Sequence, residues 1–264
     1  GVETKIYPLA GTPRGQENIS EKPLPKGYEY FIETLRDTPH NGDNFRIEET
    51  LKETDAYSEY LISYVSDSIS ISGVMNVPRG PAPEKGFPVL ILNHGLIHPS
   101  VYFPGRGSKR EKDFFARHGY VTIHPDYRGL GKSGPNPLMH HDFYVGYTRD
   151  VLNVVDAIKK SGSPLFDLNR IGMWGHSMGG GIAARAMALS PDIRAYVLFA
   201  PISAGAEDNF YELSESELGW LAQTYGVGEQ ASALYKKMSP IEYFDFVAAP
   251  VQIHHGREDT DVPI

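Results

Sequence analysis

A serine at residue 177 has the neighbours that a catalytic nucleophile needs. The stretch WGHSMGG at 174–180 contains Gly-x-Ser-x-Gly, after a short apolar run and before a helical pattern that begins at Met178. The sequence therefore places Ser177 on a sharp strand-to-helix turn, which side chains at Gly175 or Gly179 would crowd. A hydroxyl at the N-terminus of a helix, where negative charge is favoured, can attack a carbonyl carbon. A purely structural turn is the alternative interpretation.

Acyl transfer also needs two backbone N–H groups that hold the negative oxygen of the tetrahedral intermediate. One donor is expected from Met178, directly after the serine. The other is expected from Leu96, in the loop that follows His94-Gly95 at the end of an apolar run. His94 is expected to brace that loop, and His98 is a candidate residue of the substrate pocket.

A carboxylate that orients a histidine completes this chemistry. Two aspartates, Asp259 and Asp261, follow the apolar run that ends in His254 and His255. Asp259 is the predicted catalytic acid and Asp261 its rival. The alternative is that both belong to a solvated turn.

Short apolar runs mark the strands that must position these residues. Continuous rather than alternating runs are typical of strands buried on both faces of a parallel sheet. They cover residues 89–93, 120–125, 170–174, 195–200 and 251–255. Helical patterns lie between them, at 109–118, at 142–160 and after Ser177. The alternation predicts an α/β protein with a mostly parallel central sheet flanked by helices.

Three further segments differ from these runs in composition and in the pattern of their apolar residues. Residues 1–43 are expected to form an N-terminal arm, whose first 27 residues are rich in proline, glycine and charge. Alternating residues at 44–78 predict an antiparallel hairpin with one exposed face, at the start of a single domain over 44–264. The interval 204–249 is too long for a simple crossover. It is expected to be a small helical insertion, either a lid over the pocket or an ordinary crossover with extra helices.

Four motifs in chain order carry a family resemblance, LNHGL, HPDYRGLGKSG, RIGMWGHSMGGG and APVQIHHGREDTDVP. Over about residues 57–264 the chain resembles the α/β-hydrolase superfamily, and within it the prolyl oligopeptidase and dienelactone hydrolase-like serine esterases. The resemblance implies the α/β-hydrolase fold. It implies that the acid stands three residues after Gly256, at Asp259. It also implies that Tyr127 and Arg128 border the substrate pocket.

The resemblance further implies the chain order serine, acid, histidine, but no histidine follows Asp259. The ten histidines of the chain are His40, His94, His98, His118, His124, His140, His141, His176, His254 and His255. Among them, His176 is expected to pack under the serine turn. We therefore expect the catalytic histidine, with the last strand and helix of the fold, to lie outside residues 1–264. That C-terminal segment would then be a partner of the chain.

These residues predict a serine hydrolase that cleaves a small carboxylic ester through an acyl-enzyme, without a metal or an organic cofactor. A peptidase or amidase of the prolyl oligopeptidase type is the first alternative. It is disfavoured because about 80 residues before the first core strand are too few for a β-propeller. A non-catalytic binding protein on a hydrolase scaffold is the second alternative.

Composition excludes several other classes. The chain of 264 residues has a formal net charge of -8 and no basic stripe, so a nucleic-acid partner is not expected. It has no cysteine for disulfides or cysteine-bound zinc, and no run of 18 apolar residues that would predict a membrane span. The start at Gly1 is compatible with a removed signal peptide, and hence with a secreted or periplasmic protein.

Overall fold

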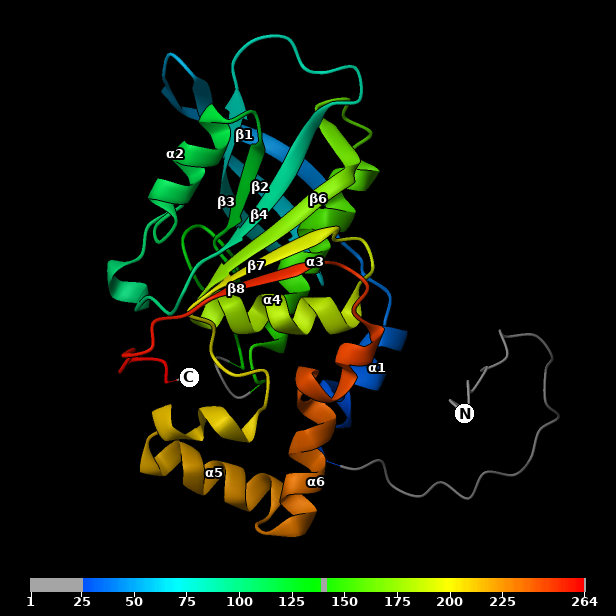
Figure 1. The fold of residues 1–264 in the computed structure, drawn as a ribbon, viewed down its shortest axis with the longest axis vertical. Coiled ribbons are helices and arrows are strands. Elements are labelled where there is room, and N and C mark those ends of the chain that lie inside the picture. Colours follow the sequence, from blue (N-terminus) through cyan, green and yellow to red (C-terminus); the bar gives the residue numbers. More distant parts are fainter. Residues whose placement is uncertain (1–25, 139–141, 264) are drawn as a thin grey trace, which may run out of the picture.

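The computed structural model describes residues 26–138 and 142–263, and its centre is one sheet (Figure 1). The strands are β1 (Asp43–Glu53), β2 (Tyr57–Ser66), β3 (Ile69–Pro78), β4 (Phe87–Asn93), β5 (Val121–Pro125), β6 (Phe166–His176), β7 (Ala195–Phe199) and β8 (Val251–His254). They lie in the order β1-β2-β3-β5-β4-β6-β7-β8. Pairing is antiparallel from β1 to β5 and parallel from β5 to β8. The predicted α/β fold, with its N-terminal hairpin, is confirmed.

Helices cover both faces of this sheet. The helices are α1 (Ile32–Asp37), α2 (Lys109–Arg117), α3 (Val145–Lys160), α4 (Met178–Leu189), α5 (Glu215–Tyr225) and α6 (Glu229–Met238), and the short 3-10 helices are η1 (Tyr28–Tyr30), η2 (Pro99–Val101), η3 (Glu207–Glu212) and η4 (Pro240–Phe246). On one face, α3 packs against β1 and β2, and α4 packs against β6 (Figure 1). On the other, α2 packs against β3 and β5. None of the helices in the described ranges has the length and apolar character needed to cross a membrane.

The predicted hairpin is β2 and β3, joined by Asp67 and Ser68 at φ 50° and 69°. Two consecutive residues with positive φ are typical of the tight turn that matches the twist of a hairpin. The expectation of one exposed face is wrong for β3. Ile71 and Met75 on one face and Val74 on the other are almost fully buried, because α2 packs on this strand and the main core lies on its opposite side.

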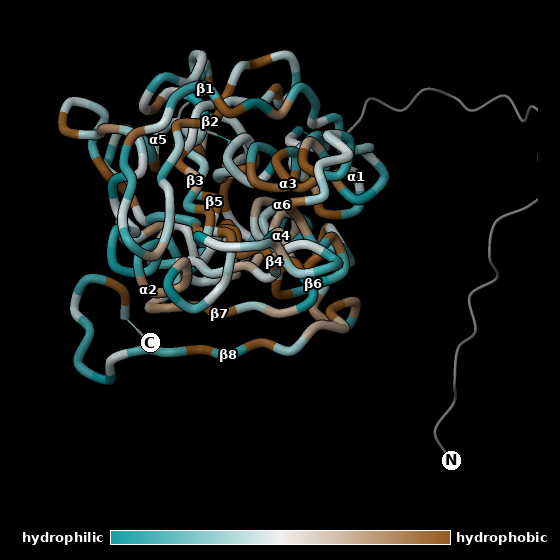
Figure 2. The backbone as a smooth tube through the Cα atoms, turned by 90° about the horizontal axis from the view of Figure 1, so that it is seen from above, coloured by the Kyte–Doolittle hydropathy of each residue, from teal (hydrophilic) through white to brown (hydrophobic). Residues whose placement is uncertain are grey.

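The last strand also differs from its prediction. The run at 251–255 was expected to be buried on both faces, yet Val251 is 41% and Ile253 63% exposed. In the described structure β8 is the outermost strand, beyond β7 (Figure 2), and β7 alone pairs with it. An outermost strand with one neighbour keeps much of its surface in water, even where its residues are apolar.

A second, smaller apolar core lies outside the sheet. Its buried members include Leu221 of α5, Tyr235 and Met238 of α6, and Phe31, which stands just before α1. Residues 28–37, inside the predicted arm, are therefore folded onto the molecule. The interval 204–249 contains α5, α6 and two 3-10 helices, as its predicted helical character requires, and Figure 1 shows these helices beside α4 and α1.

Candidate active site

The backbone at Ser177 has the conformation of a strained turn. Ser177 connects β6 directly to α4, with φ 53° and ψ -121°. A residue with a side chain rarely adopts positive φ, and such strain persists only where surrounding contacts over-determine it. Here the N–H of Ser177 donates to Phe199 O of β7, and its carbonyl accepts from Ile202 and from the first turn of α4. The turn thus presents the serine side chain at the end of the sheet.

The surrounding glycines are required by close backbone contacts. A Cβ at Gly175 would lie 2.2 Å from the carbonyl oxygen of Gly179. A Cβ at Gly179 would lie 2.2 Å from the carbonyl oxygen of Asn93, at the end of β4. A side chain at either position would therefore push the serine turn away from the neighbouring strand.

The loop after β4 lies directly against this turn. A Cβ at Gly95 would stand 3.3 Å from Ser177 Cβ. The next N–H, that of Leu96, makes no hydrogen bond within the described residues. Met178 begins α4, where the first N–H groups have no acceptor inside the helix. The two N–H groups predicted to hold an oxyanion are thus in the loop and helix end that flank the serine.

His94 supports this loop from inside the protein. Its ring is fully buried, stacked on Tyr127 at 4.3 Å between centroids and on His124 at 5.0 Å. Nδ1–H donates to the carbonyl of Gly95 over 2.7 Å. Burial lowers the pKa of His94 to about 4, so its ring is neutral near pH 7. A buried neutral ring packed in this way suits a bracing role.

Two residues expected at the pocket lie elsewhere. Tyr127 is fully buried with φ 64°, which turns its ring inward between His94 and Tyr147. Arg128 forms an ion pair with the fully buried Asp150, 2.7 Å from Nη2 to Oδ1. Neither residue is among those that line the cavity described below.

His98, the third candidate pocket residue, is exposed and begins the 3-10 turn η2. Its Nδ1 accepts the N–H of Ser100 over 3.2 Å. The ring therefore has a local capping partner, and it is not among the residues that line the cavity described below.

Of the two candidate acids, Asp259 is the one whose side chain accepts backbone hydrogen bonds. Its Oδ1 accepts the N–H groups of Asp261 and Val262 at 3.0 and 2.9 Å, which fixes the loop after β8. The N–H of Val262 is the largest cause of a lowered pKa for Asp259, and His255 and His176 contribute. Oδ2 lies 3.8 Å from His255 Nε2. Asp261 is exposed, and its backbone N–H helps to anchor Asp259.

No histidine of the described residues hydrogen-bonds to Ser177 Oγ. The ring of His176 lies beside those of Trp174 and Phe199, and a Cβ at Gly95 would stand 3.2 Å from its Nδ1. The imidazole of His255 bonds to the carbonyl of Val262 over 2.7 Å. His140 and His141 lie outside the described residues.

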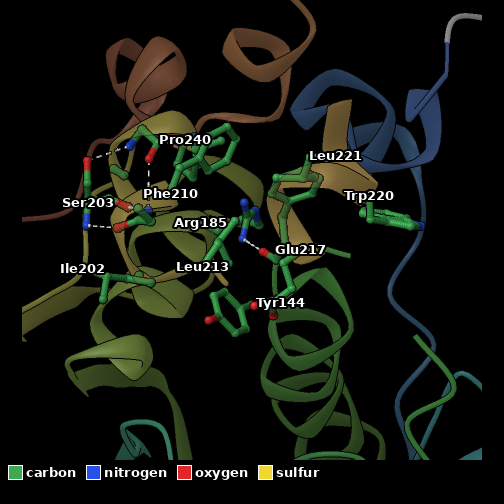
Figure 3. Close-up of a pocket in the computed structure, with 16 residues that line it drawn as sticks. Tyr144, Arg185, Ile202, Ser203, Phe210, Leu213, Glu217, Trp220, Leu221 and Pro240 are labelled. Atoms are coloured by element: carbon green, nitrogen blue, oxygen red, sulfur yellow. Dashed lines mark hydrogen bonds between the residues drawn. The ribbon is translucent and has the colours of Figure 1, made fainter. Parts of the chain in front are cut away.

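A cavity of about 90 Å³ lies between α4 and the helices of 204–249 (Figure 3). It begins close to the serine turn, because Ile202, one of its walls, donates its N–H to the carbonyl of Ser177 over 3.2 Å. The other lining residues include Phe143, Tyr144, Arg185, Leu213, Trp220 and Leu221. Sequence reasoning missed these side chains. The only signal was the aromatic content of the 204–249 interval.

Comparisons with known proteins identify a family and several similar chains. A family model described as serine aminopeptidase, S33, matches residues 88–256. An uncharacterised 31.7 kDa protein of Escherichia coli is 28% identical over 159 residues, which cover 58% of this chain and 51% of that protein. The chain thus spans about half the length of that curated relative. The uncharacterised peptidase YtmA of Bacillus subtilis is 24% identical over 208 residues, covering 78% of this chain and 75% of the relative.

Solved structures show the same fold at low identity. Acetyl xylan esterase 1 from Thermoanaerobacterium superposes with a TM-score of 0.64 and 17% identity, covering 91% of this chain and 81% of that chain. Acylaminoacyl peptidase from Pyrococcus horikoshii superposes with a TM-score of 0.59 and 23% identity, covering 81% of this chain and 34% of that chain.

Proposed function

This chain belongs to the serine aminopeptidase S33 family of α/β-hydrolases, and from that membership we propose that it is a serine esterase that cleaves carboxylic esters through an acyl-enzyme. The observation that carries the proposal is the strained backbone of Ser177, at φ 53° between β6 and α4. Such strain at a serine is a feature of nucleophile turns, in which the hydroxyl is exposed above the sheet.

In the proposed reaction, Ser177 Oγ attacks the ester carbonyl, and the N–H groups of Leu96 and Met178 stabilise the oxyanion. A histidine takes the serine proton and returns it to the departing alcohol. Asp259 orients that histidine and stabilises its charged form. Water then attacks the acyl-enzyme and frees the acid and the serine. We propose that this histidine is none of those in the described residues, because no hydrogen bond joins any of them to Ser177 Oγ.

Ester rather than amide cleavage is supported by the extent of the structural likeness. Acetyl xylan esterases from two bacteria are covered over 81% and 86% of their chains. In the acylaminoacyl peptidase the likeness covers 34% of the chain. A peptidase with the same catalytic residues is the second candidate, and it is supported by the family description and by the name of the relative YtmA.

The test compares p-nitrophenyl esters with aminoacyl p-nitroanilides, using the full natural protein. We expect kcat/KM for the esters to exceed that for the anilides, and Ser177→Ala to lower ester turnover by a factor on the order of 10⁴ or more. Ser163→Ala is the matched control, because Ser163 precedes β6 at the opposite end of the sheet.

Equal turnover of anilides and esters would make the protein a peptidase. Ester turnover that survives Ser177→Ala would remove the serine mechanism. Absence of turnover of either substrate class by the full natural protein would favour a non-catalytic binding protein.

A further inference from the structure

The cavity beside α4 contains one charged side chain that the proposed reaction does not use. Ser177, Gly181 and Arg185 stand four residues apart, so they follow one face of the helix. Gly181 and Arg185 both line the cavity. Eight residues of helix rise about 12 Å, so this face leads from the nucleophile to Arg185 at the far end.

The guanidinium of Arg185 is buried without a carboxylate partner. Arg185 is 6% exposed, and Figure 3 shows its guanidinium among the lining residues, between Leu221 and Tyr144. Nη1 donates to Phe143 O, and Nη2 donates to Met238 O over 3.3 Å. Nε has no hydrogen-bond partner, and no carboxylate of the described residues lies within ion-pair distance.

The negative charge of Asp142 raises the pKa of Arg185 without direct contact in an ion pair. Its Oδ2 accepts the N–H of Gly146 over 2.6 Å. Burial lowers the pKa of Arg185 to about 10, which leaves the group charged near pH 7. Asp142 and Arg185 form no ion pair within the described residues.

A buried guanidinium without an ion-pair partner destabilises the folded protein unless a bound anion supplies the missing partner. Burying a charge without its counter-ion costs several kcal/mol, and the five N–H donors of a guanidinium here meet two carbonyl oxygens. Arg185 lines a cavity with mostly apolar walls, which strengthen electrostatic attraction. A carboxylate is the group that fits a guanidinium best, because the two can form parallel hydrogen bonds.

We propose that Arg185 binds a carboxylate at the far end of the acyl group, so that the preferred substrates are half-esters of dicarboxylic acids. The inference rests on the proposed esterase function. The acyl side is favoured because the cavity begins at the first turn of α4, next to the serine to which the acyl group becomes attached. Leu213, Trp220 and Leu221 then contact the methylene groups between the two ends.

One acidic residue, Glu217, also lines the cavity. Its Oε2 accepts from the N–H and the hydroxyl of Ser214 at 2.8 and 2.5 Å, which holds it at the start of α5. A substrate with an ammonium group near Glu217 is the competing possibility, so the test includes one.

The experiment uses three p-nitrophenyl esters with the same six-carbon acyl chain: the hexanoate, the half-ester of adipate and the 6-aminohexanoate. For the wild-type protein we expect kcat/KM for the adipate half-ester to exceed that for the hexanoate by about tenfold. Arg185→Gln should abolish this preference by lowering kcat/KM more for the adipate half-ester than for the hexanoate, and Arg185→Lys should keep part of the preference. Arg194→Gln, at an exposed arginine before β7, is the control and should leave the preference intact.

Equal or faster turnover of the hexanoate or the aminohexanoate by the wild type would overturn the inference, whether or not the variants fold. An equal loss for all three esters in Arg185→Gln would also overturn it.

Binding of monoethyl adipate and of ethyl hexanoate to Ser177→Ala, followed by calorimetry, separates this inference from the proposed function. Tighter binding of the adipate, lost in Ser177→Ala with Arg185→Gln, would support the carboxylate site even if no ester were hydrolysed. Equal binding of the two ligands would refute the site even in an active esterase.

Discussion

At the scale of single residues, the serine turn depends on contacts that admit no extra atom. Gly179→Ala would place a Cβ against the carbonyl of Asn93 at the end of β4. We expect the free energy of unfolding to fall by about 2 kcal/mol and ester kcat/KM to fall by about 100-fold, because the nucleophile shifts. Urea unfolding and steady-state kinetics measure the two effects.

Gly219 is the matched control for that substitution, since a Cβ there meets no atom within 4 Å. It lies inside α5, so Gly219→Ala should stabilise the protein by up to about 1 kcal/mol and leave turnover unchanged. Equal effects of the two substitutions would mean that the close contact at Gly179 is unimportant.

Two buried histidines beneath the loop after β4 predict sensitivity to acid. Burial lowers the pKa of His94 to about 4 and that of His124 well below its usual value. The unfolded chain gains these protons near pH 6.5, and the folded chain does so only at lower pH. Stability is therefore full above about pH 6.5 and declines as the pH falls, by up to about 3 kcal/mol for His94 near pH 4.

Urea unfolding between pH 7.5 and 4.5, with NMR titration of the histidine rings, tests this dependence. The ring of His94 should titrate near pH 4, and that of His124 should also titrate well below the usual range of a histidine. Titration of the two buried rings near pH 6.5 would contradict the expectation.

At the scale of the elements, the alternation at 44–78 predicted one hairpin, whereas the structure has three strands there, β1, β2 and β3. The unpredicted third strand, β1, reads DNFRIEETLKE, and its apolar Ile47 and Leu51 are 52% and 42% exposed. The serine turn was predictable because its glycines are neighbours in the sequence. Arg185 was not, since its burial depends on helices that follow it by tens of residues.

The turn of the hairpin is joined to α3 by a buried charge cluster. Arg128, in the loop after β5, forms ion pairs with Asp150 of α3 and with Asp67 of the hairpin turn. Its Nη2 lies 2.7 Å from Asp150 Oδ1 and 3.4 Å from Asp67 Oδ2. Arg128→Met would leave Asp150 buried without its partner and should cost about 3 to 5 kcal/mol of unfolding free energy.

A surface pair provides the comparison for that variant. Arg79 and Glu53 lie 3.1 Å apart but are 44% and 65% exposed, so Arg79→Met should cost less than about 1 kcal/mol. Similar losses in the two variants, measured by urea unfolding, would argue against a special role for the buried cluster.

At the scale of the whole molecule, the main apolar core is separate from the core of the helical interval. The main core joins α3 and α4 to the sheet, and the other lies among α5, α6 and the segment before α1. Because the cavity has walls from both α4 and α5, we propose that 204–249 acts as a lid on the domain over 44–264.

Phe31, 3% exposed in the smaller core, tests this division. Phe31→Ala should remove about 3 kcal/mol or more of packing from α5 and α6. Hydrogen exchange should then accelerate in these helices and change little in β4 and β6. Phe114→Ala, at a side chain 55% exposed, is the control. Equal acceleration throughout the protein would mean that the cores unfold as one unit.

The conformation of Ser177 has a consequence on the timescale of evolution. A serine at φ 53° costs the native state about 1 to 3 kcal/mol that a glycine would largely spare. Random substitution under selection for stability alone would therefore tend to remove it. Descendants of this gene that lost their substrate should accumulate glycine at this position. Serine should persist in lineages in which turnover of the substrate benefits the cell.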